Sequence, residues 1–231
     1  MSGQKEYNLT FNLNEYILQT FTLGEKVYKV RAYENIVYVS NPVDTLYQKM
    51  NVYIPEEYFE EGSINGYTSI TAPIFFPNKI GGYMQALPVS LKSDENKQTS
   101  EIPVALSKGY IVASAGVRGR TTIDKIGVFT GKAPAAIVDL KAAVRYLRFN
   151  DRIMPGDANK IISNGTSAGG ALSVLLGATG NNPDYEPYLK DLGAAAAADN
   201  IFAVSAYCPI TNLDNSDKAY EWQFDGIYTY Q

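Results

Sequence analysis

The segment from Lys160 to Leu176 constrains the fold of this chain most strongly. A short, mostly apolar run, Lys160–Ser163, leads into the glycine-rich turn Asn164–Gly170, and the apolar segment Ala171–Leu176 follows directly. The turn contains Gly165-Thr-Ser-Ala-Gly169, a G-x-S-x-G string. Glycines at those two positions let a strand turn sharply into a helix, because side chains there would collide with neighbouring backbone. We therefore predict a strand, a tight turn and a helix, which requires a sheet covered by helices.

Four short apolar runs predict strands of this sheet. They are 73–77, 110–114, 160–163 and 202–207. Nearly continuous apolar runs are typical of strands covered on both faces, so the sheet is expected to be mostly parallel. A helix is predicted over 133–148, where six apolar residues recur at helical spacing. They are Ala136, Ile137, Leu140, Ala143, Val144 and Leu147. The same spacing predicts outward-facing charges at Asp139, Lys141, Arg145 and Arg148.

The first seventy residues favour an antiparallel opening. Mixtures of β-branched, aromatic and polar residues predict strands at 7–13, 26–32, 35–39 and 49–54. Segments 57–70 and 85–108 predict loops, and the alanine run 194–198 predicts a small-residue helix. We find no internal repeat and no long linker. Residues 1–231 are thus expected to form a single α/β domain, with a β-rich opening over 1–70 and a βαβ core over 72–222.

The composition argues against several classes of protein. The 20 basic and 24 acidic residues are interspersed, which gives a formal net charge of -4, so no nucleic acid partner is expected. The longest uncharged run, 161–183, is interrupted by glycine and asparagine and predicts no membrane span. A single cysteine, Cys208, and an N-terminus without a basic and then apolar leader predict a cytoplasmic protein. No cofactor and no metal site are expected.

Ser167 is the candidate nucleophile, since a turn of this kind presents the serine hydroxyl above the sheet. The N–H of Ala168 would open the following helix, where unpaired N–H groups favour negative charge on a substrate carbonyl oxygen. A second such donor is expected at Gly81 or Gly82, after strand 73–77, where glycine lets the backbone approach a ligand. The alternatives are a plain Gly-Gly turn there, and a tight packing turn or phosphate-binding loop at 164–170, although that loop lacks the glycine spacing of phosphate-binding motifs.

Two further candidates follow strands on the same edge of the sheet, where α/β proteins bind ligands. Arg118, after strand 110–114, is predicted either to meet an anionic substrate or to fix its loop through an ion pair. Ile210, after strand 202–207, is predicted either to flank an aromatic acyl ring or to pack in the core.

Several strings resemble bacterial tannases and their feruloyl-esterase-like relatives, which have the α/β-hydrolase fold. They are Ala72–Asn78 with Gly81–Met84, Lys132–Leu140, Met154–Ala158, Asn164–Gly170 and Ala206–Asn212. The turn itself is common to many esterases, whereas the longer strings are more specific. The resemblance implies a serine esterase that cleaves galloyl esters, which are small aromatic substrates, through an acyl-enzyme. It also implies that Ser167 is the nucleophile and that the N–H groups of Gly81 and Ala168 form the oxyanion hole.

The sequence contains no histidine, although a triad needs a base between its acid and its serine. In the family that the chain resembles, the acid, the histidine and a lid-like insertion lie beyond the strand matching 202–207. The resemblance therefore implies the N-terminal half of a longer esterase, inactive or nearly so alone, whose other half could be a separate partner chain. The alternatives are a feruloyl esterase or peptidase of the same fold, or a non-catalytic binding domain if Gln231 is the natural end.

Overall fold

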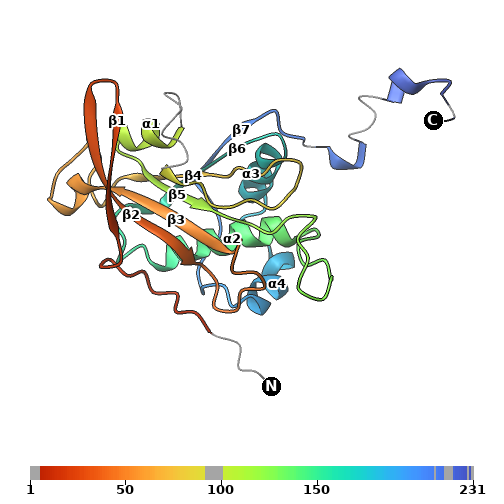
Figure 1. Ribbon diagram of the computed structural model, residues 1–231, viewed down its shortest axis with the longest axis horizontal. Coiled ribbons are helices and arrows are strands. Elements are labelled where there is room, and N and C mark those ends of the chain that lie inside the picture. The colour runs from red at the N-terminus through yellow and green to blue at the C-terminus, as the bar shows by residue number, and fades with distance from the viewer. Residues whose placement is uncertain (1–5, 92–100, 211, 216–220, 228, 230–231) are drawn as a thin grey trace.

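The computed structural model describes residues 6–91, 101–210, 212–215, 221–227 and 229. Among these residues, seven strands form one mixed sheet in the order β1-β2-β3-β5-β4-β6-β7 (Figure 1). The strands are β1 (Ile17–Leu23), β2 (Lys26–Val37), β3 (Lys49–Pro55), β4 (Pro73–Pro77), β5 (Ile111–Ala115), β6 (Asp157–Thr166) and β7 (Ala203–Tyr207). The α-helices are α1 (Glu101–Ser107), α2 (Ala135–Phe149), α3 (Ala168–Ala178) and α4 (Glu186–Asp191). Short 3-10 segments are η1 (Glu56–Phe59), η3 (Pro183–Tyr185), η4 (Leu213–Asn215) and η5 (Trp222–Phe224).

Helices cover both faces of the sheet, so each central strand contributes to two apolar cores. Met50, Val52 and Ile54 of β3 belong to the core that α2 and α3 cover, whereas Tyr53 between them belongs to the core under α1. Successive side chains of a strand point to opposite faces, which explains the alternation. The result is a three-layered α/β/α domain (Figure 1).

The strand order places a topological switch point between β4 and β6. β1, β2 and β3 are antiparallel, β3 is antiparallel to β5, and the strands β5, β4, β6 and β7 are parallel. The chain after β4 continues to α1 on one face of the sheet, whereas the chain after β6 continues to α3 on the other face. Loops that leave adjacent parallel strands in opposite directions open a space at the carboxyl edge, where ligands bind in α/β proteins.

Most predicted elements of the second half are confirmed, with shifted ends. The four apolar runs are β4, β5, β6 and β7, and the helix predicted over 133–148 is α2. The sheet is parallel over these strands, and the β-rich opening is antiparallel, as predicted.

Several predictions for the first half are wrong. Residues 7–13 form no strand, because their backbone bonds to a side chain: Phe11 N–H donates to Asn150 Oδ1 at 2.8 Å and Asn150 Nδ2 donates to the Leu9 carbonyl at 2.9 Å. Segment 26–32 and residues 35–37 of the predicted segment 35–39 belong to one strand, β2, with an irregular register between Tyr33 and Ile36, and Val39 forms only an isolated bridge.

Three further elements differ from the predictions. The strand β1 was not predicted, and the segment 85–108, expected to be a loop, contains α1. The alanine run 194–198 is not helical, since Ala194 forms an isolated bridge with Val39.

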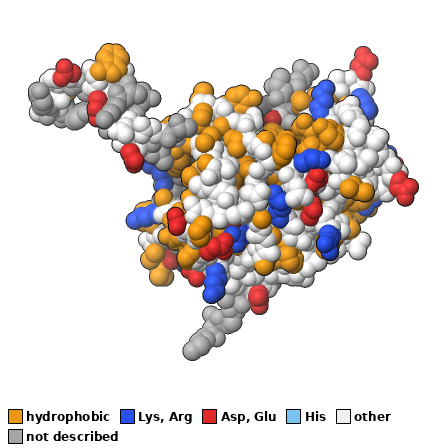
Figure 2. Space-filling view, turned by 180° about the vertical axis from the view of Figure 1, so that it is seen from behind, with side chains coloured by type: hydrophobic (Ala, Val, Ile, Leu, Met, Phe, Trp, Pro, Cys, Tyr) orange, Lys and Arg blue, Asp and Glu red, His pale blue; other side chains and the backbone are white. Residues whose placement is uncertain are grey.

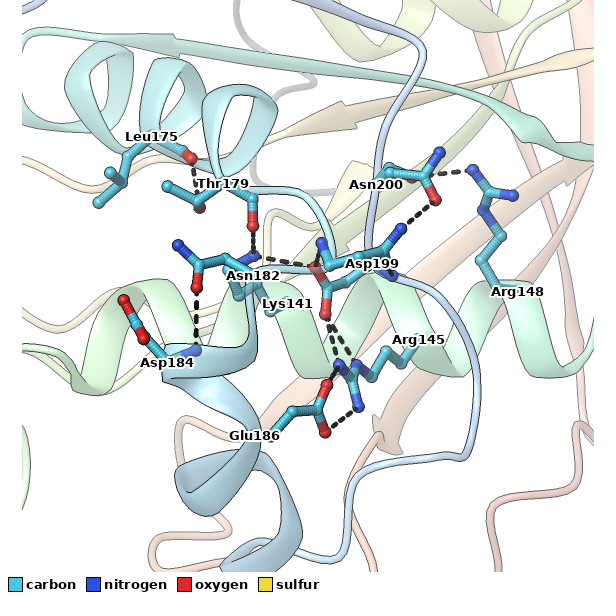
Figure 3. Close-up of polar contacts among 11 residues, drawn as sticks. Lys141, Arg145, Arg148, Leu175, Thr179, Asn182, Asp184, Glu186, Asp199 and Asn200 are labelled. Carbon is cyan, nitrogen blue, oxygen red and sulfur yellow. Dashed lines mark hydrogen bonds and ion pairs between the residues drawn. The ribbon is translucent and has the colours of Figure 1, made fainter.

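The charged residues of α2 are largely buried, so the prediction that they face outward is wrong. Asp139 and Lys141 are fully buried, Arg145 is 8% exposed and Arg148 is half-buried. Figure 3 shows Lys141 and Arg145 pointing toward Asp199, in the segment before β7. The charged residues do lie on one side of α2, but residues distant in sequence cover that side of the helix.

The outer surface carries mixed charge, and one sheet edge is apolar. Figure 2 shows acidic and basic side chains interspersed over the face that it views. Within the part of the chain that the structure describes, β7 pairs only with β6 and leaves Phe202, Val204 and Tyr207 exposed at or beside this edge. None of the described helices has both the length and the apolar character needed to span a membrane.

Candidate active site

Ser167 occupies a strained turn at the carboxyl edge of the sheet. β6 ends at Thr166, α3 begins at Ala168, and Ser167 between them has φ 57° and ψ -122°. A non-glycine residue in such a conformation costs about 1–3 kcal/mol and persists only where the surroundings hold it. Here the Ser167 N–H donates to the Tyr207 carbonyl at 2.9 Å, and the Ser167 carbonyl accepts from Ala171 N–H at 2.9 Å. These bonds hold an exposed serine in the predicted strand–turn–helix arrangement.

The two glycines of the G-x-S-x-G string are needed for space. A Cβ at Gly165 would lie 2.4 Å from the Gly169 carbonyl oxygen and 2.8 Å from Asn78 Nδ2. A Cβ at Gly169 would lie 2.4 Å from Asn78 Oδ1 and 3.0 Å from the Ile80 carbonyl oxygen. Neither glycine has a positive φ, so close approach rather than backbone freedom explains them. The turn is thus packed tightly against the chain that follows β4.

Gly165→Ala is expected to lower the free energy of unfolding by about 2–3 kcal/mol, because the new methyl group meets backbone that cannot rotate away. Urea denaturation of this chain measures the change. Gly81→Ala is the matched control: no atom lies within 4 Å of a Cβ there and φ is not positive, so a change below about 1 kcal/mol is expected. Equal losses in the two variants would contradict the packing argument.

The predicted oxyanion residues lie after the carboxyl ends of the neighbouring strands β4 and β6. Ala168 is the first residue of α3, so its N–H has no carbonyl acceptor one turn earlier within the helix. Gly81 and Gly82 are exposed in the loop after β4, and the Ile80 carbonyl packs on the first turn of α3. Gly82 has φ 56°. The structure therefore brings Ser167, Ala168 and the glycine loop to one edge of the sheet.

Arg118 is held by the ion pair that the sequence analysis gave as one of its two alternatives. Its Nη2 and Nε donate to the two carboxylate oxygens of Asp139 at 2.8 and 3.0 Å, and its Nη1 donates to the Thr130 carbonyl at 3.0 Å. Burial alone would lower the pKa of Arg118, but the ion pair with Asp139 outweighs it and raises the pKa above its ordinary value. Arg118 thereby fixes the loop after β5, and a role toward substrate stays a prediction.

Ile210 follows β7 and is 41% exposed, so it does not pack in the core as one alternative had it. Pro209 lies beside the first turn of α3, since its Cα would be 3.5 Å from a Cβ at Gly170. Contact of Ile210 with a substrate ring stays a prediction.

A cavity of about 350 Å³ lies between α2 and α3, beside the glycine loop. Its walls are mainly apolar and come from both helices, η3, and the loops after β4 and β5. They include Tyr83, Arg120, Pro134, Ile137, Leu172 and Leu175. Arg120 N–H donates to the Tyr83 carbonyl at 2.9 Å, which joins the two loops at this cavity. Its volume is that of a small-molecule pocket.

A family model described as BD-FAE matches residues 87–225, which is more than half of the chain. The chain belongs to the BD-FAE family. This match includes the whole Ser167 turn, β7 and α2.

Solved tannases have the same fold as this BD-FAE protein. The tannase of Fusobacterium nucleatum is 60% identical, with a TM-score of 0.92, over 96% of this chain and 46% of that one. A tannase of Lactobacillus plantarum is 48% identical, with a TM-score of 0.87, over 95% of this chain and 47% of that one. The chain therefore spans about half the length of these tannases. The resemblance to tannases and feruloyl-esterase-like α/β-hydrolases is confirmed.

A curated esterase matches a shorter part of the BD-FAE protein. Esterase LipC of Mycobacterium tuberculosis is 38% identical over 71 residues, which cover 31% of this chain and 17% of LipC. Both kinds of relative carry names of ester-hydrolysing enzymes.

Two groups that hold the Ser167 turn are not apparent from the motifs of the sequence. One is the Tyr207 carbonyl, which no side-chain pattern can reveal. The other is Asn78, which is 3% exposed directly after β4. Its signal was an amide side chain immediately after an apolar strand, a position where a polar residue needs a buried partner.

Proposed function

We propose that this chain carries the nucleophile of a serine carboxylic ester hydrolase that acts on galloyl and related hydroxyaromatic esters. The strained, exposed conformation of Ser167 at the β6–α3 turn carries the proposal, since functional strain of this kind presents a serine hydroxyl to substrate. Similarity to tannases at 48–60% identity supports the choice of substrate, and a related tannin acyl hydrolase was solved in complex with ethyl gallate.

In the proposed reaction, Ser167 Oγ attacks the ester carbonyl carbon and its proton passes to a general base. The negative charge on the carbonyl oxygen is stabilised by the N–H groups of Ala168 and Gly81. Collapse of this intermediate releases the alcohol, which takes up a proton, and leaves the acyl group on Ser167. Attack by water then releases the carboxylic acid and restores the serine.

The base of this reaction lies outside these 231 residues in our proposal, because the chain has no histidine. A triad serine that lacks its base loses several orders of magnitude in rate, and the oxyanion donors retain only a residual effect. We therefore expect this chain alone to hydrolyse esters slowly or not at all.

The experiment uses the protein from the complete reading frame and measures release of acid from methyl gallate, methyl ferulate and a simple aryl ester. A higher kcat/KM for methyl gallate is expected. Mass spectrometry after rapid acid quenching should find the galloyl group on the peptide that contains Ser167. Failure to hydrolyse any of the three esters, or an acyl group on another residue, would refute the proposal. A preference for methyl ferulate would keep the mechanism and change the substrate class to feruloyl esters.

A further inference from the structure

We infer that Asn78 is a positioning residue that locks the loop carrying Gly81 onto the turn carrying Ser167. The inference rests on the proposed function for its catalytic consequence, although its structural basis is independent of it. Asn78 is the first residue after β4, it is 3% exposed, and it lies at the carboxyl end of the β4–β6 strand pair.

The amide of Asn78 reaches three groups on β6 and α3. Its Nδ2 donates to the carbonyls of Asn164 at 3.0 Å and Gly169 at 3.2 Å, and lies 2.9 Å from Ser173 Oγ. Its backbone N–H also donates to the Asn164 carbonyl at 2.9 Å. The residue thus ties the end of β4 both to the strand before Ser167 and to the helix after it.

The shape of the turn matches this amide. Positions 165 and 169 would each place a Cβ within 3 Å of the Asn78 amide, at 2.8 Å from Nδ2 and 2.4 Å from Oδ1 respectively. The two glycines of the serine motif therefore leave the space that the Asn78 side chain fills. A residue that packs between both motif glycines is well placed to set the position of the serine between them.

Asn78 acts at a short distance along the chain from the predicted oxyanion donor. Ile80 N–H lies 3.5 Å from Asn78 Oδ1, and the Ile80 carbonyl packs on Gly169, so the segment from Asn78 to Ile80 follows the surface of the α3 first turn. Gly81 comes next. Displacement of a catalytic group by about 1 Å can cost about 100-fold in rate, so loosening this contact should separate the Gly81 N–H from the Ala168 N–H.

The hydrogen bond between Ser163 and Ser173 provides a control that separates the positioning effect of Asn78 from a general loss of stability. Ser173 Oγ also accepts from Ser163 Oγ at 2.9 Å, and both serines are fully buried. Ser163→Ala removes one buried hydrogen bond of the same network and leaves every contact of Asn78 in place. It is therefore a matched control for the cost of weakening this part of the core.

The first measurement uses this chain and follows hydrogen exchange at the backbone amides of Ile80 and Met84, which donate to Asn78 Oδ1 and to the Gly81 carbonyl. Asn78→Ala is expected to speed exchange of these amides about 10-fold or more relative to the wild type, whereas Ser163→Ala is expected to leave them unchanged. Asn78→Asp is the second variant, since it keeps the size of the side chain and loses its donor, and it replaces Asn78→Ala if that variant fails to fold. Equal protection of the Ile80 and Met84 amides in the wild type and the Asn78 variants would overturn the inference.

The second measurement uses the protein from the complete reading frame with methyl gallate. The Asn78 variants are expected to lower kcat by about 10- to 100-fold with KM changed less than threefold, and Ser163→Ala to change kcat less than threefold. Unchanged kcat in folded Asn78 variants would overturn the inference. If the wild-type protein hydrolyses no ester, the proposed function fails and the exchange experiment alone decides whether Asn78 holds the loop.

Discussion

Replacement of Ser167 by alanine is expected to lower kcat/KM for methyl gallate by about 10³-fold or more in the protein from the complete reading frame. In the proposed mechanism Ser167 alone forms the acyl-enzyme, so only binding and the proposed oxyanion donors would remain. Alanine keeps the positive φ at this position, so the strain of the turn is retained. Steady-state kinetics measure kcat/KM, and mass spectrometry after acid quenching shows whether an acyl-enzyme forms.

Ser167→Gly separates two effects, the loss of the nucleophilic hydroxyl and the relief of backbone strain at this position. It should abolish hydrolysis in the same way, yet raise the free energy of unfolding of this chain by about 1 kcal/mol, because glycine adopts a positive φ without a Cβ penalty. Ser107→Ala is a control at the opposite edge of the sheet, where α1 ends before β5, and should leave kcat/KM unchanged. Full activity in Ser167→Ala would show that Ser167 is not the nucleophile. Destabilisation by Ser167→Gly would show that the backbone at this position is not strained.

Asp199→Asn is expected to lower the free energy of unfolding by about 3–5 kcal/mol, since it leaves two buried cations without their shared partner. Asp199 is 1% exposed and accepts from Lys141 Nζ at 2.9 Å and Arg145 Nε at 2.8 Å (Figure 3). It also accepts from the Asn181 N–H at 2.7 Å. Lys141 is fully buried, so water cannot compensate for the lost charge. Urea denaturation of this chain near pH 7 tests the expectation.

Glu186→Gln provides the matched control in the same ion network. Glu186 pairs with Arg145 from the other side, but its side chain is 53% exposed, so a change below about 1 kcal/mol is expected. Similar losses of unfolding free energy in the two variants would show that burial does not determine how much these contacts contribute to stability.

The pH dependence of stability gives an independent check on Asp199. Burial alone would raise the pKa of this carboxyl, but hydrogen bonds from Lys141, the Asn181 N–H and Arg145 outweigh it and hold the pKa below its ordinary value of 3.8. A lowered folded-state pKa means that the carboxylate stabilises the fold above the unfolded-state pKa and that this contribution is lost as pH falls through the folded-state value. The wild type should therefore lose part of its advantage over Asp199→Asn below about pH 4.

The sequence predicts the second half of this fold better than the first, and the difference has a physical cause. The strands β4 and β5 and the 161–165 part of β6 are almost entirely buried, so their apolar runs are visible in the sequence, and β7 has such a run although it is an edge strand of the described sheet. Residues 7–13 mix aromatic, apolar and polar residues as a half-buried strand does. Two of their backbone hydrogen bonds, however, are made with Asn150, which lies far along the chain. Local composition cannot distinguish a strand from an extended segment held by one distant side chain.

The charged face of α2 illustrates a second limit. Helical spacing identifies the polar side of α2 but not what covers it, and Lys141 and Asp199 are 58 positions apart. For the site, the string Gly165–Gly169 predicted the position and the turn of Ser167 because its geometry is local. The contacts of Asn78 are formed between strands that are distant in sequence, so they become visible only in the folded chain.

The packing of Asn78 between two glycines restricts which substitutions can occur at these positions during the evolution of this family. The amide and the two missing side chains share one small volume, so no one of the three positions can accept a larger residue alone. Positions 78 and 169 should therefore vary together among relatives, with a larger residue at 169 accompanied by a smaller one at 78, whereas position 165 should stay glycine because the Gly169 backbone also blocks a Cβ there. Substitution at 169 would meet a fitness barrier that a compensating change at 78 removes.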